Sequence, residues 1–169
     1  MGVYISEIFN QIDKAKSRND KIEILKRYKA NRFFMSILWN NFNRYPPFFV
    51  ESEKDLPDVK CDEGPLGCTP GSLYNAARTF YTLRINHPCN NEKKMKIYIS
   101  TYQGLHKDEA KIYKDVILGR VKVNGLTEKL IREVFPNLLP PILESPKKKT
   151  KPKEEEPQEK KVDGSEEKS

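Results

Sequence analysis

Residues 120–140 read RVKVNGLTEKLIREVFPNLLP, and this stretch decides how the chain is organised. Asn124-Gly125 favours a tight turn because both residue types tolerate a positive φ angle. Thr127 is a good N-cap, and apolar residues then recur at helical spacing until Pro136 ends the helix. The stretch therefore predicts a turn followed by a short amphipathic helix, and the residues upstream predict the helices that support it.

Apolar spacing and capping residues predict six more helices upstream. They span residues 3–17, 20–29, 31–43, 69–85, 90–104 and 107–118. In the first, Ile5, Ile8, Phe9 and Ile12 mark one buried face. Because no segment shows the alternation of a β-strand, we expect an all-α domain over residues 1–144, a compact bundle of about six to seven short helices.

Several of these helices begin at recognisable capping residues. Asp20 with Glu23 resembles a capping pair, and Asn31 can cap the third helix. Thr69 is the expected N-cap of the fourth helix, with Pro70 at its first position. The apolar face expected for that helix comprises Leu73, Ala76, Ala77, Phe80 and Tyr81.

The aromatic residues of the third helix have two interpretations. Phe34 and Phe42 recur on its apolar face, and Trp39 lies beside that face. Such residues can pack in a core or stack on nucleic-acid bases, and core packing is the ordinary outcome for an apolar stripe.

Residues 46–68 form a long segment rich in Pro, Gly and acidic residues, without periodicity. We expect its beginning, Phe48-Phe49-Val50, to be an ordered strap and its acidic part, residues 51–63, to be mobile. The six acidic residues are Glu51, Glu53, Asp55, Asp58, Asp62 and Glu63. Residues 145–169 are rich in Lys, Glu and Pro, and this composition predicts a disordered tail.

The chain has 169 residues and a net charge of +7, of which residues 1–145 carry +6. Since a third of the acidic side chains in that part crowd into the loop, the helices are clearly basic, which favours a polyanionic partner. The sequence contains no membrane-spanning run or signal peptide, and its three cysteines suggest no disulfide framework. We therefore expect a cytoplasmic protein with reduced thiols, not bound to a membrane.

The sequence offers no arrangement for catalysis. His87 and His106 are its two histidines, and the spacing of Cys61, Cys68 and Cys89 does not fit a zinc knuckle. Neither a Gly-rich phosphate loop nor a serine nucleophile elbow is present. We expect no catalytic residue, cofactor or metal ion. The ordinary interpretation is that the cysteines are free thiols and that the histidine lies in a turn.

Residues 3–140 resemble the N-terminal DNA-binding domain of the ATP-dependent DNA ligase of T-even bacteriophages. The resemblance rests on the opening helices, on Asp115-Val-Ile-Leu-Gly-Arg120 and on the pattern from Gly125-Leu-Thr127 through Ile131 to Phe135-Pro-Asn-Leu-Leu-Pro140. It implies an all-helical domain that grips duplex DNA from the minor-groove side. The ligase pattern has an acidic residue where this chain has Val121. The extra basic residue Lys122 can compensate in charge but not in geometry.

Residues 64–140 also resemble a family of small uncharacterised proteins of T-even-like tailed phages. The shared features are Ser72-Leu-Tyr-Asn75, Asn86-His-Pro88, Gly104-Leu-His106 and Gly125-Leu-Thr127. This second resemblance implies a phage origin and no known activity. Residues 161–164 read KVDG, which matches the nucleotidyl-attachment signature of ligases, but the surrounding Lys/Glu tail indicates a chance match.

The sequence thus predicts a non-catalytic, monomeric protein that binds double-stranded DNA with little sequence specificity, in phage DNA replication, repair or related metabolism. Phosphate contacts carry no base information, hence the expected lack of specificity. The predicted DNA-binding residues are Arg120, Lys122, Asn124, Gly125, Thr127, Lys129 and Arg132. Alternatively, these residues are an ordinary solvated face, and the chain is an adaptor that docks on a replication or transcription protein through the acidic loop or the tail. An enzyme is the third alternative.

Overall fold

The computed structural model describes residues 3–43 and 45–141. Its helices are α1 (Ile5–Lys14), α2 (Arg18–Arg27), α3 (Arg32–Phe42), α4 (Leu73–Ala76), α5 (Thr79–Thr82), α6 (Asn91–Gln103), α7 (Lys107–Ile117) and α8 (Glu128–Val134), with one 3-10 turn, η1 (Glu53–Asp55). Besides two isolated β-bridges, the described residues contain no β-structure. The predicted all-α fold is confirmed.

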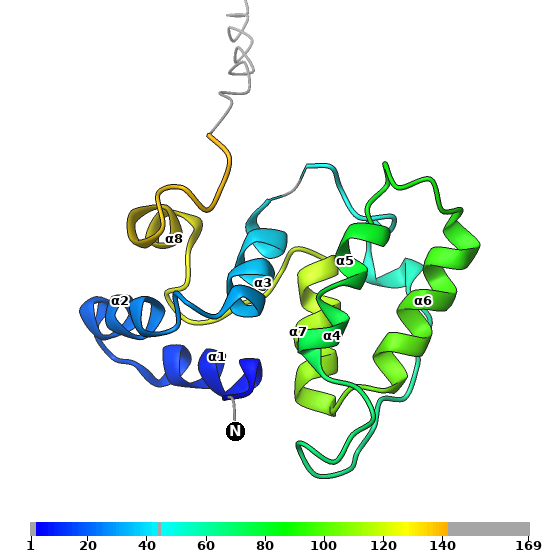
Figure 1. The fold of residues 1–169 in the computed structure, drawn as a ribbon, viewed down its shortest axis with the longest axis horizontal. Helices are drawn as coiled ribbons and strands as arrows, with labels where there is room; N and C mark the ends of the chain where they lie inside the picture. Colours follow the sequence, from blue (N-terminus) through cyan, green and yellow to red (C-terminus); the bar gives the residue numbers. More distant parts are fainter. Residues whose placement is uncertain (1–2, 44, 142–169) are drawn as a thin grey trace, which may run out of the picture.

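Helix α7 holds the two sides of the molecule together (Figure 1). It contacts α1 and α3 on one side and α4 and α6 on the other. Its inward residues Ala110, Tyr113, Val116 and Ile117 are all buried, as their spacing predicts. The helices α1, α2, α3 and α8 thus form one side of the bundle, and α4 to α6 form the other.

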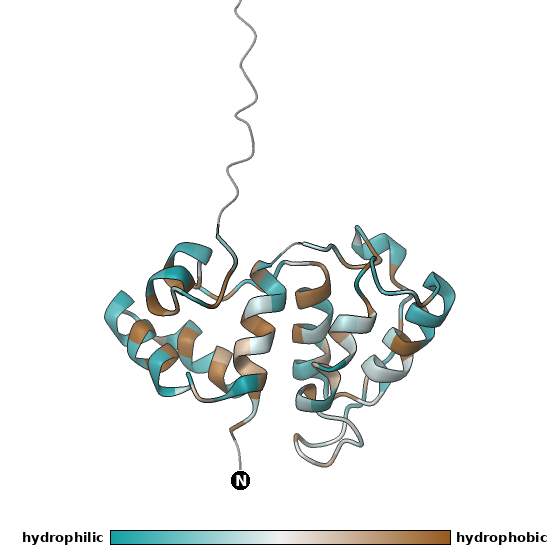
Figure 2. Cartoon of the chain, turned by 45° about the horizontal axis from the view of Figure 1, so that its top comes forward, coloured by the Kyte–Doolittle hydropathy of each residue, from teal (hydrophilic) through white to brown (hydrophobic). Residues whose placement is uncertain are grey.

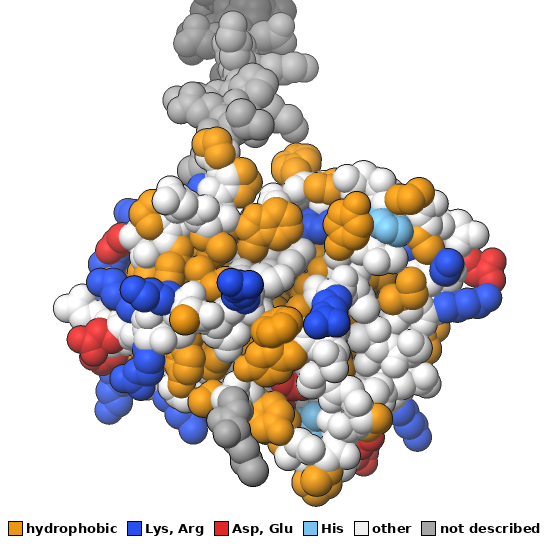
Figure 3. All heavy atoms as spheres, viewed as in Figure 1, with side chains coloured by type: hydrophobic (Ala, Val, Ile, Leu, Met, Phe, Trp, Pro, Cys, Tyr) orange, Lys and Arg blue, Asp and Glu red, His pale blue; other side chains and the backbone are white. Residues whose placement is uncertain are grey.

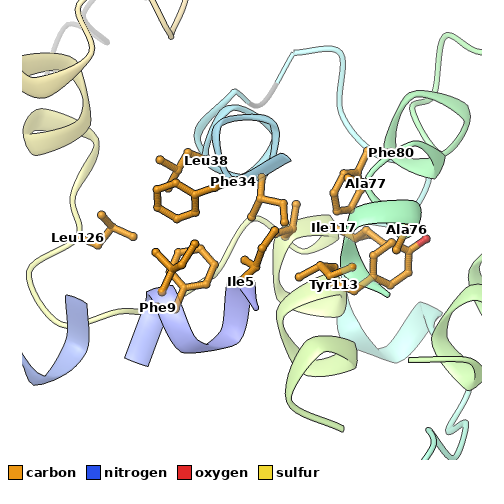
Figure 4. Packing of buried hydrophobic residues seen from close by; sticks show 14 of the residues in the cluster. Ile5, Phe9, Phe34, Leu38, Ala76, Ala77, Phe80, Tyr113, Ile117 and Leu126 are labelled. Carbon is orange, nitrogen blue, oxygen red and sulfur yellow. The ribbon is translucent and has the colours of Figure 1, made fainter. Parts of the chain in front are cut away.

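A single hydrophobic core runs between these two sides. Figure 4 shows its buried side chains in sequence across the molecule, from Leu126 through Phe9, Phe34 and Ile5 to Tyr113. Figure 2 shows the same arrangement as brown helix faces turned inward. Ile5, Ile8 and Ile12 are fully buried, because the spacing i, i+3, i+7 places them on one face of α1.

The aromatic side chains belong mainly to this core. The rings of Phe9 and Phe34 meet edge to face with centroids 5.6 Å apart, and Phe80 stacks on Tyr113 at 5.3 Å. The packing role expected for Phe34 is confirmed, since its side chain is fully buried. Burial also raises the pKa of Tyr113 to about 12.

Local capping signals fix most helix starts. The Asn31 side chain accepts hydrogen bonds from the N–H groups of Phe33 and Phe34, and that of Thr127 accepts one from Leu130. Asn90 caps α6 in the same way, through the N–H group of Lys93. The Asn31 and Thr127 caps are the predicted ones, and Asn90 lies at the predicted start of its helix. Each of the three satisfies a backbone donor that would otherwise lack a partner.

Two predicted helix starts are wrong. Helix α2 is capped by Ser17, which exchanges hydrogen bonds with Asp20 in a capping box, and not by Asp20 with Glu23. The Thr69 hydroxyl donates to the carbonyl of Gly71 instead of capping a helix, and Ser72 takes the N-cap position. The Ser17 and Ser72 starts both lie a few residues from the predicted ones.

The predicted helix over residues 69–85 is also wrong in its length. It is divided into two short helices, α4 and α5, and Tyr81 is 73% exposed instead of inward-facing. Helix α4 is held at its first residue by Glu109, whose carboxylate accepts the Leu73 N–H group at 3.0 Å. Burial raises the pKa of Glu109, so this carboxylate is held in a poorly solvated site.

The segment after α3 is attached to α5 and α7. Phe48 and Val50 are buried, and the Phe49 N–H group donates to the Leu83 carbonyl at 2.9 Å, as expected for an ordered strap. Further along, η1 places the Glu53 carboxylate against Lys114 and Arg120. The acidic loop therefore lies along α6 and α7, and the predicted mobility of its acidic part stays a prediction.

The turn before α8 is tied to both of the first two helices. Asp13 on α1 accepts the Asn124 N–H group at 2.9 Å, and the Lys21 ammonium on α2 donates to the Asn124 carbonyl. Gly125 has a φ angle of +72°, so the predicted tight turn with positive φ is confirmed.

None of the helices within residues 3–43 and 45–141 has the length and apolar composition needed to cross a membrane.

Gly125→Ala should lower the free energy of unfolding by about 1–3 kcal/mol, because a non-glycine residue is strained in the left-handed region. Its Cβ would also lie 2.8 Å from the Lys21 ammonium nitrogen. Urea unfolding followed by circular dichroism measures the change.

Gly104→Ala is the matched control. Gly104 has a φ angle of −82°, and an added Cβ would meet nothing closer than 3.7 Å. This substitution should leave stability unchanged or slightly raised, because alanine restricts the unfolded chain. Equal losses for both substitutions would contradict the role assigned to the turn.

Candidate nucleic-acid interface

A concave surface between the start of α2 and the start of α8 encloses a volume of about 450 Å³. We call it the basic concavity. It is lined by Lys16, Arg18, Lys21, Gly125, Thr127, Lys129 and Leu130. Four of these seven residues are cationic and none is acidic, so the lining presents a concentrated positive charge to any ligand.

The local sequence explains how these residues meet. The Ser17 cap starts α2 immediately after Lys16, and the Thr127 cap starts α8 two residues before Lys129. Between the two caps, the Lys21 side chain packs on Gly125 and reaches the Asn124 carbonyl. Two helix starts, distant in sequence, thereby face the same solvent space.

The four cations differ in how much of their charge is engaged inside the protein. Arg18 is paired with Glu133 of α8, and Lys21 is 6% exposed with its ammonium group on the Asn124 carbonyl. Lys16 and Lys129 are exposed, and within the described part of the chain neither side chain has a hydrogen-bonding partner. Lys16 and Lys129 are therefore the cations best placed to meet an external anion.

The structure brings together three of the seven predicted DNA-binding residues. Gly125, Thr127 and Lys129 line the basic concavity. Asn124 is adjacent in sequence, but its backbone N–H and carbonyl groups are bound to Asp13 and Lys21. Gly125, Thr127 and Lys129 are therefore the members of the predicted set that share one surface.

Arg120 lies elsewhere and is held by two carboxylates. Its Nε donates to Asp115 at 3.0 Å, and a terminal nitrogen donates to Glu53 at 2.8 Å. These hydrogen bonds raise the pKa of the guanidinium group. Arg120 thus fixes the acidic loop to the end of α7, and a phosphate would have to compete with Glu53 and Asp115 for it.

Arg132 and Lys122 are also separated from the basic concavity. Arg132 pairs with Glu128 one turn earlier in α8 and donates to the Pro140 carbonyl at 2.8 Å. It therefore anchors the chain that leaves α8. Lys122 is exposed and lines a different concave surface between α1 and α7, which Asp13 and Asp115 also line.

Sequence reasoning missed Lys16, Arg18 and Lys21. A signal was available, because residues 14–21 read KAKSRNDK and contain four cations in eight positions. What the sequence could not reveal is that this segment faces residues 125–130, more than a hundred positions later. Figure 3 shows Lys and Arg side chains gathered on the α2 side of the molecule.

The acidic loop lies away from the basic concavity. Its Glu53, Leu56 and Asp58 line a surface with Tyr98 of α6 and Lys114 of α7. In Figure 1, α6 stands on the opposite side of the molecule from α2, and α7 stands between them. A loop rich in carboxylates repels phosphates at close range, and this loop lies away from the basic concavity.

The remaining candidates for chemistry have structural surroundings. The buried His106 caps α7 by accepting the Asp108 N–H group, and the His87 ring accepts that of Cys89. The described residues contain three free cysteines and no group of three His, Cys, Asp or Glu side chains placed to hold a metal ion. The KVDG sequence at 161–164 and the Lys-rich run at 147–153 lie outside the described residues.

Arg120→Ala should raise the pKa of Glu53 from about 2 toward its ordinary value of 4.5, because hydrogen bonding to Arg120 is the largest cause of the low value. In the wild-type protein the Glu53 ion pairs are present at neutral pH and are lost as pH falls toward about 2. Carboxyl-carbon NMR shifts recorded against pH measure this titration.

Asp55 provides the internal control for that titration. Its pKa is lowered by hydrogen bonds from Ser52, so Arg120→Ala should leave it unchanged. A Glu53 titration that does not respond to the substitution would show that Arg120 does not hold the acidic loop.

Comparison with solved structures finds a similar fold. A solved chain named Pmar-Lig_PreS3, by its name ligase-related, superposes with a TM-score of 0.64 over 83% of this chain at 18% sequence identity. This chain spans 32% of the length of that one. Neither the comparison with protein-family models nor the one with curated proteins gives a match. At this identity the likeness concerns the fold, and the described helices are arranged as in a ligase-related protein.

Proposed function

We propose that the chain is a non-catalytic module that binds double-stranded DNA through the basic concavity. The observation that carries this proposal is the meeting of four cations and two helix starts around one surface whose lining contains no carboxylate. Lys and Arg side chains near exposed backbone N–H groups suit phosphate oxygens.

Some of the cations are engaged inside the protein and others are not, so the proposed phosphate contacts differ from the predicted ones. Lys16 and Lys129 make the outer phosphate contacts, while Arg18 and Lys21 supply charge and shape from within the surface. Gly125 and Thr127 let the backbone approach the phosphates closely. Arg120 and Arg132 act in the fold through Glu53, Asp115 and Glu128.

Binding of this kind is strongly salt-dependent and nearly independent of sequence. Each phosphate neutralised by a cation releases condensed counterions, and no base edge is read by such a contact. The fold likeness to a ligase-related protein supports DNA as the ligand. We place the function in phage DNA replication, repair or related metabolism, as a monomer in the cytoplasm, the type of compartment that unpaired thiols favour.

The second candidate function is that of an adaptor for a replication or transcription protein. The observation that favours it is the ion pairing of Glu53 with Lys114 and Arg120, which fixes the acidic loop on α6 and α7. A fixed loop presents its exposed carboxylates, such as Asp58, in a defined arrangement. A basic protein surface is the partner that this arrangement suits.

The test is fluorescence anisotropy of a labelled duplex of about 24 base pairs, titrated with the full chain at several salt concentrations. Lys16→Glu/Lys129→Glu should weaken binding by about tenfold or more at low salt. It should also reduce the slope of log affinity against log salt by about two, because each phosphate contact contributes about 0.9.

Lys93→Glu/Lys107→Glu is the matched control, since it changes the net charge equally with exposed residues of α6 and α7. It should retain nearly the wild-type affinity and slope. Equal losses in both double variants would mean that only net charge matters, and no binding by the wild-type chain at low salt would exclude DNA as the ligand.

A further inference from the structure

Three of the four large hydrophobic side chains that are exposed among the described residues lie at one corner of the fold. Tyr45 is 81% exposed, Tyr81 is 73% exposed and Ile85 is 59% exposed. Exposed Pro47 belongs to the same corner, because its carbonyl accepts the Ile85 N–H group at 2.9 Å. We call these four residues the aromatic corner. Figure 3 shows hydrophobic side chains gathered along this upper part of the face, over the ends of α3 and α5.

The aromatic corner is held rigidly from below by a buried arginine. Arg84 is 3% exposed and donates to the carbonyls of Asn43 and Pro46 and to the Asn40 side chain. Its guanidinium carbon lies 4.0 Å from the centre of the Phe48 ring. The Tyr45 N–H group donates to the Asn43 side chain at 3.2 Å, so Tyr45 has a fixed backbone although its ring is in solvent.

Tyr81 is positioned as well. Its ring meets His87 edge to face, with centroids 5.2 Å apart. Exposed apolar side chains gathered at one corner indicate a surface for a partner, because such patches are costly to leave in water. The partner must offer flat apolar groups to two tyrosine rings.

Charge identifies the partner more closely. Two cations contact the backbone of this corner: Arg84 donates to the Pro46 carbonyl, and the Lys94 ammonium group donates to the Ile85 carbonyl at 3.4 Å. Arg84 itself has neutral hydrogen-bonding partners within the described residues. Exposed aromatic rings beside cations suit a single-stranded nucleic acid, whose bases stack while its phosphates are attracted.

We propose that the aromatic corner binds single-stranded nucleic acid by stacking bases on Tyr45 and Tyr81. The DNA recognised by the whole chain is then a duplex with an adjoining single-stranded stretch, a statement that rests on the proposed duplex binding at the basic concavity. Helices α2 and α8, which carry the basic concavity, lie on one side of α3, and α5 lies on the other (Figure 1).

The experiment compares three labelled probes in anisotropy titrations with the full chain: a blunt duplex of about 24 base pairs, the same duplex with an overhang of about 12 nucleotides, and that overhang alone. The overhang duplex should bind at least about fivefold more tightly than the blunt one. Tyr45→Ala/Tyr81→Ala should remove this preference and leave blunt-duplex affinity unchanged, whereas Tyr45→Phe/Tyr81→Phe should keep it.

Trp39 gives a second readout. It is the single tryptophan of the chain, and the Arg84 guanidinium carbon lies 5.5 Å from the centre of its ring. Its fluorescence should change when the single strand alone is added, and this change should be lost in the alanine variant. Circular dichroism should show that both tyrosine variants fold, since the substituted rings are exposed.

The outcomes separate the two proposals. If single-strand binding persists while the blunt duplex does not bind, the proposed duplex function fails and the aromatic corner keeps its role. An overhang preference that survives Tyr45→Ala/Tyr81→Ala, or no preference at all, would overturn the assignment. Self-association that light scattering detects in the wild-type chain but not in the alanine variant, without single-strand binding, would instead assign the corner to a second copy of this chain.

Discussion

The candidate interface depends on two hydrogen bonds, by which two charged side chains hold the backbone of Asn124. Asp13 accepts its N–H group, and Lys21 donates to its carbonyl. Hydrogen bonds that involve a charged group contribute about 1.5–3 kcal/mol each, more than neutral ones. Because Asp13 belongs to α1 and Lys21 to α2, these contacts fix the turn before α8 against the first two helices. The basic concavity is the space that this attachment leaves between the starts of α2 and α8.

The distribution of cations follows from the chemistry of their side chains. Arg120 and Arg132 each bind a carboxylate within the fold, and Arg120 also reaches a second one. A guanidinium group carries several donors in a rigid plane, which suits such internal attachments. Lys16 and Lys129 keep their single charges on flexible chains in solvent. The arginines thus stabilise the frame, and these two lysines face outward.

Much of the fold could be predicted from local sequence. Apolar spacing identified the buried faces of α1 and α7, and the residues Asn31, Asn90 and Thr127 marked three helix starts. Such signals act over one or two helical turns, so one sequence suffices to find them. The prediction failed over residues 69–85, where Glu109 of a later helix fixes the start of α4 and the predicted helix is divided into α4 and α5.

The candidate site was predicted less completely, because it depends on long-range contacts. The Gly125 turn and the Thr127 cap were visible in the sequence, and Lys129 followed from them. The pairing of Arg120 with Glu53, 67 positions earlier, was not visible, and neither was the approach of Lys16 to α8. Charge counted along a sequence does not reveal which cations already have a carboxylate partner.

We propose that duplex DNA meets the protein at the basic concavity. The most direct measurement is a titration of the isotopically labelled full chain with an unlabelled duplex, followed by amide NMR shifts. The largest changes should occur at residues 16–21 and 125–130, with small changes at residues 51–63 on the opposite side. Changes confined to residues 51–63, or no changes at low salt, would contradict it.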